Sequence, residues 1–335
     1  MKVAGLGSPI IDLIFQVDDP QLAANVSGEK GGMNQIDDAE RRRLLAAMAR
    51  LGAPTTRAIG GSAFNTIAAL ARLGMPTRFL GKTGCDGEGD YFRRRYREIG
   101  GDVSALKSTG DAPTANCLCF VTPDSQRTMR SHLGASLLLR PDELDADDFC
   151  GVTHLHIEGF QFFMGGIVRR AAELAQSSGA TVSLDLASFE VVRRFRSEVE
   201  ALLPYLDLIF ANEDEAREFL RLPPGARLDP ELAAGEIARS VGSAVVKGGA
   251  GGAWISHRDT VVHVDALPTA AVDTTGAGDF WQAGFLYGIL RGRPAETAGK
   301  MGALLAARVV AVLGAELPER TWNDLRRAVA ALERP

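Results

Sequence analysis

The residues best suited to chemistry lie in a string that begins at Asp273, Asp-Thr-Thr-Gly-Ala-Gly-Asp-Phe-Trp-Gln-Ala-Gly-Phe. Asp279 stands where the small residues of this string give way to an apolar pattern typical of a helix. The backbone N–H groups of Gly276, Ala277 and Gly278 would lie at the helix N-terminus, where the helix dipole favours an anion. A carboxylate there is repelled by a bound phosphate, unless it takes a proton from the group that attacks the phosphate. The string therefore indicates phosphoryl transfer, with Asp279 as general base and the three N–H groups as an anion hole.

A simpler interpretation also exists, because an aspartate after a Gly-rich turn is a common N-cap of a helix. The full string, D-T-T-G-A-G-D-x-x-x-A-G-F, resembles the C-terminal motif of the PfkB (ribokinase-like) family of sugar and nucleoside kinases. The resemblance implies that the γ-phosphoryl group of ATP is transferred to a primary hydroxyl, with Mg²⁺ as the metal. It also implies that Asp273 and Thr275 support a monovalent cation, as in some members, and leaves open whether this protein needs K⁺.

A second Gly-rich turn precedes a helical pattern at residues 60–65, Gly-Gly-Ser-Ala-Phe-Asn. Such a turn serves chain reversal more often than binding. It is similar to the family's N-terminal motif, G-G-x-x-x-N, which holds substrate hydroxyls. The resemblance implies that Asp12, Gly61 and Asn65 bind substrate, and that Glu158 matches a carboxylate that contacts a sugar. Carboxylate and amide groups suit a polyol because they pair with neighbouring hydroxyls at a defined geometry.

After residue 150, short apolar runs alternate with helical patterns, which predicts a mostly parallel sheet covered on both faces. Such sheets bind ligands at the carboxyl ends of their strands. The side chains expected at these ends are Glu158, Asp185, Asn212 with Glu215, and Lys247. Each of them could equally be a loop residue or a helix cap, and only their common location favours a site.

The resemblance assigns roles to several of these residues. Asn212 and Glu215 match the family's N-x-x-E motif, which implies that they position Mg²⁺ and the phosphates, Glu215 through water. Magnesium retains much of its hydration shell, so one carboxylate together with ATP oxygens is a sensible site. Lys247, Gly249 and Gly252 lie in a Gly-rich run that matches the family's nucleotide loop, so we expect them to contact ATP.

The rest of the chain predicts the elements that position these residues. We expect strands at 2–6, 77–81, 154–158, 181–186, 206–211 and 244–246, and helices at 38–51, 66–73, 88–99, 166–176, 231–240 and 298–315. Residues 18–37 are polar and rich in Gly and Asn, which predicts a loop or hairpin excursion. Residues 115–121 and 127–132 read as a hairpin inserted between the βα units.

The resemblance implies a fold for these elements. It is a single domain over residues 1–335, with a three-layer α/β/α ribokinase-like fold whose central sheet is mostly parallel. A small β-sheet lid, formed by about 12–59 and 103–135, would close over the substrate. A lid meets a physical need, because water that reached the site would hydrolyse ATP.

Composition narrows the class of protein. The chain has 335 residues, 46% of them hydrophobic, and a net charge of −5, which gives no support for nucleic-acid binding. No apolar run is long enough to cross a membrane, the N-terminus lacks a signal-peptide pattern, and the four cysteines lack zinc-ligand spacing. His154 and His156 share one face of a strand, but two ligands are weak evidence for a metal. We expect a cytoplasmic monomer or homodimer that acts on a small molecule, with neither a nucleic-acid nor a membrane partner.

The acceptor is indicated by two further segments. Residues 5–12, Gly-Leu-Gly-Ser-Pro-Ile-Ile-Asp, resemble the opening of adenosine kinases, and Arg127-Thr128-Met129 is similar to the same branch. The resemblance therefore favours a nucleoside acceptor, adenosine first. Two alternatives stay open: a sugar kinase for ribose, fructose or another sugar, and a ligand-binding protein on a kinase scaffold that no longer catalyses.

Overall fold

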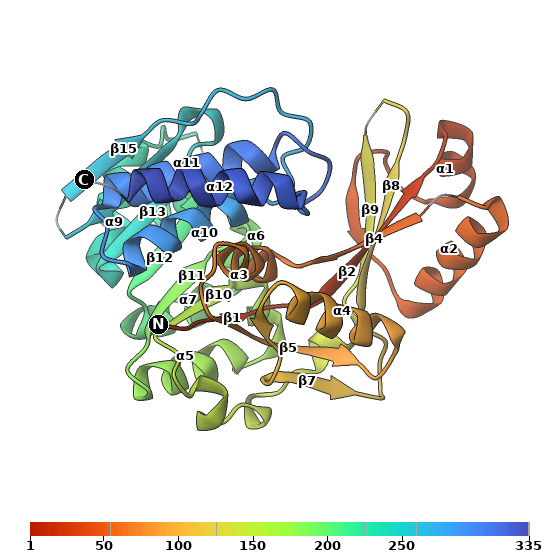
Figure 1. Ribbon diagram of the computed structural model, residues 1–335, viewed down its shortest axis with the longest axis horizontal. Coiled ribbons are helices and arrows are strands. Elements are labelled where there is room, and N and C mark those ends of the chain that lie inside the picture. The colour runs from red at the N-terminus through yellow and green to blue at the C-terminus, as the bar shows by residue number, and fades with distance from the viewer. Residues whose placement is uncertain (54, 125, 224, 259, 334–335) are drawn as a thin grey trace.

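The structure is a computed structural model that describes residues 1–53, 55–124, 126–223, 225–258 and 260–333. It consists of an α/β body and a smaller sheet that projects from one end of the body (Figure 1). The central sheet of the body contains β1 (Val3–Leu6), β5 (Thr77–Gly84), β6 (Gly101–Asp102), β7 (Leu106–Thr109), β10 (His154–Glu158), β11 (Thr181–Asp185), β12 (Leu208–Asn212), β13 (Ser243–Lys247), β14 (Ala253–His257) and β15 (Thr260–Val264).

The strand order of this sheet is β15-β14-β13-β12-β11-β10-β1-β5-β6, with β7 also paired to β5. The strands from β13 to β6 and β7 are parallel, and only β14 and β15 pair antiparallel to their neighbours. The mostly parallel sheet predicted from the sequence is therefore confirmed. Residues 106–109, which we expected within the lid, instead belong to this sheet as β7.

Helices cover both faces of the central sheet. One layer contains α3 (Ser62–Arg72), α4 (Gly87–Glu98), α10 (Ala277–Leu290), α11 (Ala295–Val309) and α12 (Glu319–Leu332), and the other contains α5 (Ile167–Ser177), α6 (Phe189–Arg194), α7 (Arg196–Leu202), α8 (Glu213–Phe219) and α9 (Pro230–Val241). Successive strand residues alternate between the two cores: Phe210 packs with the first layer, and its neighbours Ile209 and Ala211 pack with the second. The three-layer architecture is thus confirmed. Across the described residues, none of these helices has the length and apolarity that a membrane span requires.

Single turns of 3₁₀ helix connect several elements. They are η1 (Gly134–Leu138), η2 (Pro141–Glu143), η3 (Ala146–Phe149), η4 (Gly159–Met164), η5 (Leu203–Tyr205) and η6 (Gly249–Gly251). Two of them directly follow strands of the central sheet and shape its carboxyl edge: η4 follows β10, and η6 comes after β13.

The smaller sheet, called the small sheet below, has the strand order β3 (Met33–Gln35), β9 (Arg127–His132), β8 (Ala115–Val121), β2 (Ile10–Gln16) and β4 (Thr55–Gly60). Its helices, α1 (Asp19–Asn25) and α2 (Asp38–Leu51), lie at the end of the molecule remote from the body (Figure 1). Along β2, Ile11, Leu13 and Phe15 are buried, whereas the alternate residues Ile10 and Asp12 remain partly exposed on the opposite face.

Residues 18–37 differ from the predicted loop, because they form α1 and β3. Asp18 caps α1 by accepting a hydrogen bond from Gln21 N at 2.7 Å. The strand β3 exists because it pairs with β9, from Met33 opposite Met129 to Gln35 opposite Ser131. A partner so distant in sequence leaves no trace in the local residue pattern.

The N-terminus of α3 is fixed by a glycine and by aromatic packing. Gly61 has a φ of 115°, and a Cβ there would lie 2.1 Å from the carbonyl oxygen of Ser8, so only glycine fits. One turn later, Phe64 packs between Phe79 and Phe92, with ring centroids 5.2 and 4.5 Å away. Gly61 thus lets α3 begin against the loop that joins β1 to β2, and Phe64 holds the first turn of α3 against β5 and α4.

The helix predicted at 298–315 ends earlier, because α11 stops at Val309. The following residues turn back toward the start of the Gly-rich string. The carbonyl oxygen of Val310 accepts a hydrogen bond from Val272 N at 2.7 Å, and Gly314 N donates to Asp273 Oδ2 at 2.8 Å. The Ala- and Gly-rich composition suggested a longer helix, but these contacts require the chain to leave it.

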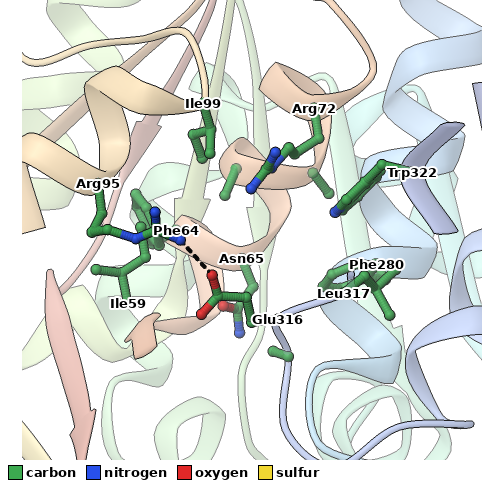
Figure 2. A pocket seen from close by; sticks show the side chains of 13 residues that line it. Ile59, Phe64, Asn65, Arg72, Arg95, Ile99, Phe280, Glu316, Leu317 and Trp322 are labelled. Atoms are coloured by element: carbon green, nitrogen blue, oxygen red, sulfur yellow. Dashed lines mark hydrogen bonds and ion pairs between the residues drawn. The ribbon is translucent and has the colours of Figure 1, made fainter. Parts of the chain in front are cut away.

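Figure 2 shows how the far end of this loop is fastened to the body. Glu316 accepts a hydrogen bond from Arg95 of α4 at 2.7 Å, at the mouth of a small cavity. Leu317, Phe280 and Trp322 form the apolar side of the same cavity, with the two aromatic rings stacked 5.8 Å apart. Asn65 also lines this cavity, so the loop after α11 and the start of α3 are neighbours.

Helices α10 and α11 pack so closely that glycine is required between them. A Cβ on Gly284 would lie 2.4 Å from the carbonyl oxygen of Met301. We predict that Gly284→Ala lowers the free energy of unfolding by about 2 kcal/mol, because the helices must move apart. In the control, Gly235→Ala in α9, the nearest atom is Val261 Cγ2 at 4.0 Å, so stability should rise by about 0.5 kcal/mol. Urea unfolding checks both, and equal stability of the two variants would contradict the prediction.

Candidate active site

Asp279 lies in the first turn of α10, where it meets the first turn of α3. Ser62 Oγ donates to Asp279 Oδ1 and Asn65 Nδ2 donates to Asp279 Oδ2, both at 2.8 Å. Burial raises the pKa of Asp279 to about 7, and the negative charge of Asp185 adds to this, against the opposing effects of the two hydrogen bonds and of Lys247. The carboxylate is therefore held in place and poised to exchange a proton near neutral pH.

The loop before Asp279 has the geometry of a helix N-terminus preceded by a turn. Gly276 is the N-cap of α10, with a φ of 75°. The N–H of Ala277 closes the turn by donating to the carbonyl oxygen of Thr274 at 3.1 Å, so an anion would have to share or displace this bond. A Cβ on Gly278 would lie 3.3 Å from Lys247 Nζ, which places the ammonium group directly beside the loop.

Lys247 is the centre of a buried charge cluster. Its ammonium nitrogen lies 3.5 Å from Asp185 Oδ1, and Gln282 of α10 donates to Asp185 Oδ2 at 2.7 Å. Burial lowers the pKa of Lys247, but the charges of Asp185, Glu215 and Asp279 outweigh this effect and raise it above its ordinary value. Lys247 and Asp185 both stand at the last residue of their strands, so the parallel sheet brings them to one edge.

Asn212 and Glu215 form a reciprocal pair at the start of α8. Asn212 Nδ2 donates to Glu215 Oε1 at 2.7 Å, Asn212 N donates to Glu215 Oε2 at 2.8 Å, and Glu215 N donates to Asn212 Oδ1 at 2.8 Å. Burial raises the pKa of Glu215 to about 7, with a further contribution from Asp185 and an opposing one from Lys247. Both oxygens of Glu215 are thus engaged within the protein, and this fits a carboxylate that reaches a metal through water rather than directly.

Glu158 ties three segments together at the end of β10. It accepts hydrogen bonds from Ser8 N at 2.9 Å, Ala63 N at 2.8 Å and Gln161 Nε2 at 2.9 Å. Burial raises the pKa of this carboxyl group, against those hydrogen bonds. Glu158 lines the cavity described below, but its oxygens mainly hold the β1–β2 loop and the start of α3, close to where the strands of the small sheet leave the body.

The small sheet has two ionisable residues close to each other, Asp12 and Arg127, and Arg127 contacts the body. Burial raises the pKa of Asp12, on β2, to about 6, although the charge of Arg127 opposes this. Arg127, on β9, forms an ion pair with Asp273 and donates to Thr275 Oγ1 at 3.1 Å. The small sheet is therefore linked by a salt bridge to the loop that precedes α10.

Two cavities flank the N-terminus of α10. The larger, about 510 Å³, is lined mostly by small and apolar residues, including Gly249, Gly252, Leu267, Pro268, Thr274, Ala277 and Trp281. The smaller, about 210 Å³, lies between the body and the small sheet and is lined by Ser8, Ile10, Met33, Gln35, Ser62, Ser131, Leu133, Glu158, Phe160, Phe163 and Met164. Ala277 borders the first cavity, and Ser62, which is bonded to Asp279, borders the second.

The structure thus brings most of the predicted residues to one edge of the body. Gly249 and Gly252 line the larger cavity, whereas Lys247, Asn212 and Glu215 lie beside the loop rather than in the cavity wall. Sequence reasoning gave no chemical role to Ser62, Gln282 or Gly314, cited Arg127 only within a segment similar to adenosine kinases, and placed Asp185 at a strand end without a specific role. Only Asp185 carried a usable signal, because it ends a predicted strand.

His154 and His156 do not form a metal site in this structure. Both rings are hydrogen-bonded to Ser183 Oγ, at 2.8 and 2.9 Å, and His154 also contacts Thr181 Oγ1 at 2.8 Å. Among the residues that the structure describes, no group of three or more His, Cys, Asp and Glu side chains is arranged to hold a metal. A metal at the carboxyl edge would therefore need oxygens from its ligand.

Removing the ammonium group of Lys247 should destabilise the folded protein, because the three carboxyl groups around it lose their positive partner. We predict that Lys247→Met lowers the free energy of unfolding by about 3 kcal/mol, because it leaves buried carboxylates unpaired. The pKa values of Glu215 and Asp279 are raised to about 7 even though Lys247 lowers them, so removing Lys247 raises them further; the loss is therefore full only at alkaline pH and diminishes as these groups protonate at lower pH. Thermal melting across pH checks this. Lys300→Met, on an exposed pair with Glu296, should cost less than about 0.5 kcal/mol, and an equal, pH-independent loss in both variants would contradict the prediction.

Comparison with known proteins identifies the family. The sequence model of the pfkB family carbohydrate kinases matches residues 31–322. A probable sugar kinase from Rhizobium etli CFN 42 has 33% identity and a TM-score of 0.82, over 99% of this chain and 98% of that chain. An adenosine kinase from Sinorhizobium meliloti has 31% identity and a TM-score of 0.81, over 98% of this chain and 99% of that chain.

A curated relative extends the likeness to nucleoside kinases. The nucleoside kinase of Methanothermobacter thermautotrophicus is 28% identical over 253 residues, which are 75% of this chain and 78% of the relative. These likenesses confirm the ribokinase-like fold and the phosphotransferase class, in which ATP and a divalent metal are used to phosphorylate a hydroxyl group of a small molecule. The chain belongs to the pfkB family of carbohydrate kinases.

Proposed function

We propose that this protein transfers the γ-phosphoryl group of MgATP to the primary hydroxyl of a nucleoside, with adenosine as the first candidate. The observation that carries the proposal is the position of Asp279 between the two cavities. It lies in the first turn of the helix whose first residue, Ala277, lines the larger cavity, and it accepts a hydrogen bond from Ser62, which lines the smaller one. A donor nucleotide and an acceptor bound in these cavities would meet at this carboxylate.

The role proposed for Asp279 is that of general base. A base that removes a proton from a hydroxyl works best when its pKa lies near the operating pH, and the pKa of Asp279 is raised to about 7. Ser62 and Asn65 orient its two oxygens. The N–H groups at Gly276, Ala277 and Gly278, together with the ammonium of Lys247, would offset the negative charge of the transferring group.

The larger cavity fits the nucleotide. Its wall of small residues, Gly249 and Gly252 among them, admits a flat base, and it opens onto the positive end of α10. Asp185, Glu215 and Asp279 surround one Lys247, so two of their three charges remain uncompensated when all are ionised. A Mg²⁺ ion bound with ATP would reduce the repulsion between these carboxylates and the phosphates, with Asn212 and Glu215 holding its water shell.

The smaller cavity favours a nucleoside over a free sugar. One part of its wall is polar, with Ser8, Ser62 and Gln35, and suits hydroxyls and base edges. The other part is apolar and includes Phe160 and Phe163, whose side chains are 40% and 44% exposed. The Phe163 ring already contacts the guanidinium of Arg194, 5.0 Å from its centroid. A ribose alone would leave Phe160 uncovered, whereas a nucleobase could stack on it.

The small sheet is proposed to act as the lid over this cavity, within a single domain of residues 1–335. It supplies Ile10, Met33, Gln35, Ser131 and Leu133 to the cavity wall. Asp12, Gly61 and Asn65 keep their proposed roles near the acceptor hydroxyls, although Asn65 is also bonded to Asp279. Closing this wall over the acceptor would keep water from the transferring group.

The alternative acceptor is a sugar such as ribose or fructose, since a sugar kinase is among the similar proteins. A binding protein without catalysis is a second alternative, and the raised pKa of Asp279 argues against it. ADP release from MgATP in the presence of adenosine, other nucleosides, ribose and fructose separates the three functions. 5′-Deoxyadenosine, which lacks the primary hydroxyl, should bind without turnover.

Asp279→Asn should lower kcat by about a thousandfold while ATP and adenosine still bind, because the amide cannot accept the proton. In the wild type, kcat/KM should fall as the pH drops below about 7, since the base is then protonated. The variant should lack this acid limb. Asp324→Asn, at an exposed position on α12, is the matched control and should keep wild-type rates. Unchanged turnover in Asp279→Asn would refute its role as base.

Phe160→Ala should separate nucleoside from sugar recognition. Without the ring, kcat/KM for adenosine should fall by about tenfold, because the nucleobase loses its stacking surface. Turnover of free ribose, which has no base to stack, should change less than about twofold and serves as the internal control. Equal losses with adenosine and ribose would show that Phe160 supports the cavity as a whole and would count against the nucleoside assignment.

A further inference from the structure

The carboxylate of Asp273 is saturated with hydrogen bonds from the protein itself. Thr275 donates twice to Oδ1, from N at 3.0 Å and from Oγ1 at 2.7 Å. Gly314 N donates to Oδ2 at 2.8 Å, and Arg127 Nη1 donates to the same oxygen. A carboxylate offers about four lone-pair sites, so none is left for an inorganic cation. The K⁺ site expected at Asp273 and Thr275 therefore does not fit this geometry.

A cation is present there nonetheless, because Arg127 supplies one. Its side chain is only 10% exposed and that of Asp273 only 9%, so the pair is shielded from competing ions in solvent. Arg127 Nη1 also reaches Thr275 Oγ1 at 3.1 Å, and its Nε donates to Cys119 Sγ at 2.9 Å on the neighbouring strand. A guanidinium cannot lose its proton in a protein, so this charge is permanent.

The electrostatic consequence concerns the loop at residues 273–278. Burial raises the pKa of Asp273, but hydrogen bonds from Thr275 and Gly314 and the charge of Arg127 lower it below its ordinary value. Asp273 is thus held as an anion immediately before the N–H groups of the loop. Without a nearby cation, the negative charge of Asp273 would repel a phosphate bound at those N–H groups. A neighbouring positive charge offsets this repulsion.

We propose that Arg127 takes the place of the monovalent cation at this loop, so that nucleotide binding and turnover are independent of K⁺. Since Arg127 belongs to β9, the small sheet supplies the cation to the loop of the body. The proposal that turnover is independent of K⁺ rests on the proposed kinase function. The proposal that MgADP binding is independent of K⁺ does not.

The test compares KCl with NaCl and N-methylglucamine chloride at equal ionic strength. MgADP affinity is measured by calorimetry and kcat/KM by ADP release from MgATP. In the wild type, K⁺ should change both quantities less than about twofold. Arg127→Met should weaken MgADP binding about tenfold without K⁺, and K⁺ should restore much of it, because an oxygen of Asp273 is then open. Arg127→Lys keeps the charge and should stay independent of K⁺.

Two controls keep the proposal open to refutation. Arg57→Met removes another small-sheet arginine, which pairs with Glu88 of α4 at 3.3 Å, and should create no K⁺ dependence. A double-mutant cycle of Arg127→Met with Asp273→Asn should show strongly non-additive losses in MgADP affinity, because the two residues act as one unit. Thermal melting confirms that each variant is folded.

Several outcomes would overturn the proposal. One is activation of the wild type by K⁺. Another is that the losses of MgADP affinity in Arg127→Met and Asp273→Asn simply add in the double variant, which would mean that Arg127 contacts the nucleotide directly. A third is unchanged MgADP binding in Arg127→Met. A wild type that binds MgADP but phosphorylates none of the acceptors would refute the proposed function alone, since the calorimetric comparison does not depend on turnover.

Discussion

The structure depends on one unbalanced set of charges at the carboxyl edge of the central sheet. Lys247 stands among Asp185, Glu215 and Asp279, and the one ammonium balances the three carboxyl groups only when two of them are protonated. The parallel strands bring Lys247 and Asp185 to one edge, and α10 brings Asp279. Hydrogen bonds to each carboxylate offset part of the free-energy cost of burying these charges together. Such an excess of negative charge is stabilised by nearby positive charge, and the N-terminus of α10 supplies part of it.

The small sheet contributes both shape and charge. Its inner face forms one wall of the smaller cavity, and Arg127 reaches across to Asp273 in the body. These two contributions come from neighbouring parts of the same strand, since Ser131 of β9 lines the cavity. A displacement of the sheet would therefore alter the smaller cavity and the loop before α10 together.

The sequence predicted what depends on local pattern and missed what depends on distant partners. The helix at 38–51 and the strand at 154–158 have their predicted bounds, since capping and periodicity define both locally. The string from Asp273 indicated an anion site because a turn and a helix start are encoded by adjacent residues. By contrast, β3 forms only by pairing with β9, and α11 ends early because the chain must return to Asp273. The bond from Ser62 to Asp279 joins residues far apart in the chain, so no spacing rule could reveal it.

The hydrogen bonds of Glu158 have a consequence for how such a protein can diversify. One carboxylate fixes Ser8 N, just before β2, and Ala63 N, just after β4, which are the points where the small sheet joins the body. Neither bond involves Met33, Gln35 or Leu133, which line the smaller cavity, and the salt bridge from Arg127 to Asp273 is a separate link. Substitutions at these three positions can therefore reshape the smaller cavity while both links to the body and the groups around Asp279 remain in place. The architecture allows the shape of the smaller cavity to drift through evolution while the groups around Asp279 stay constant.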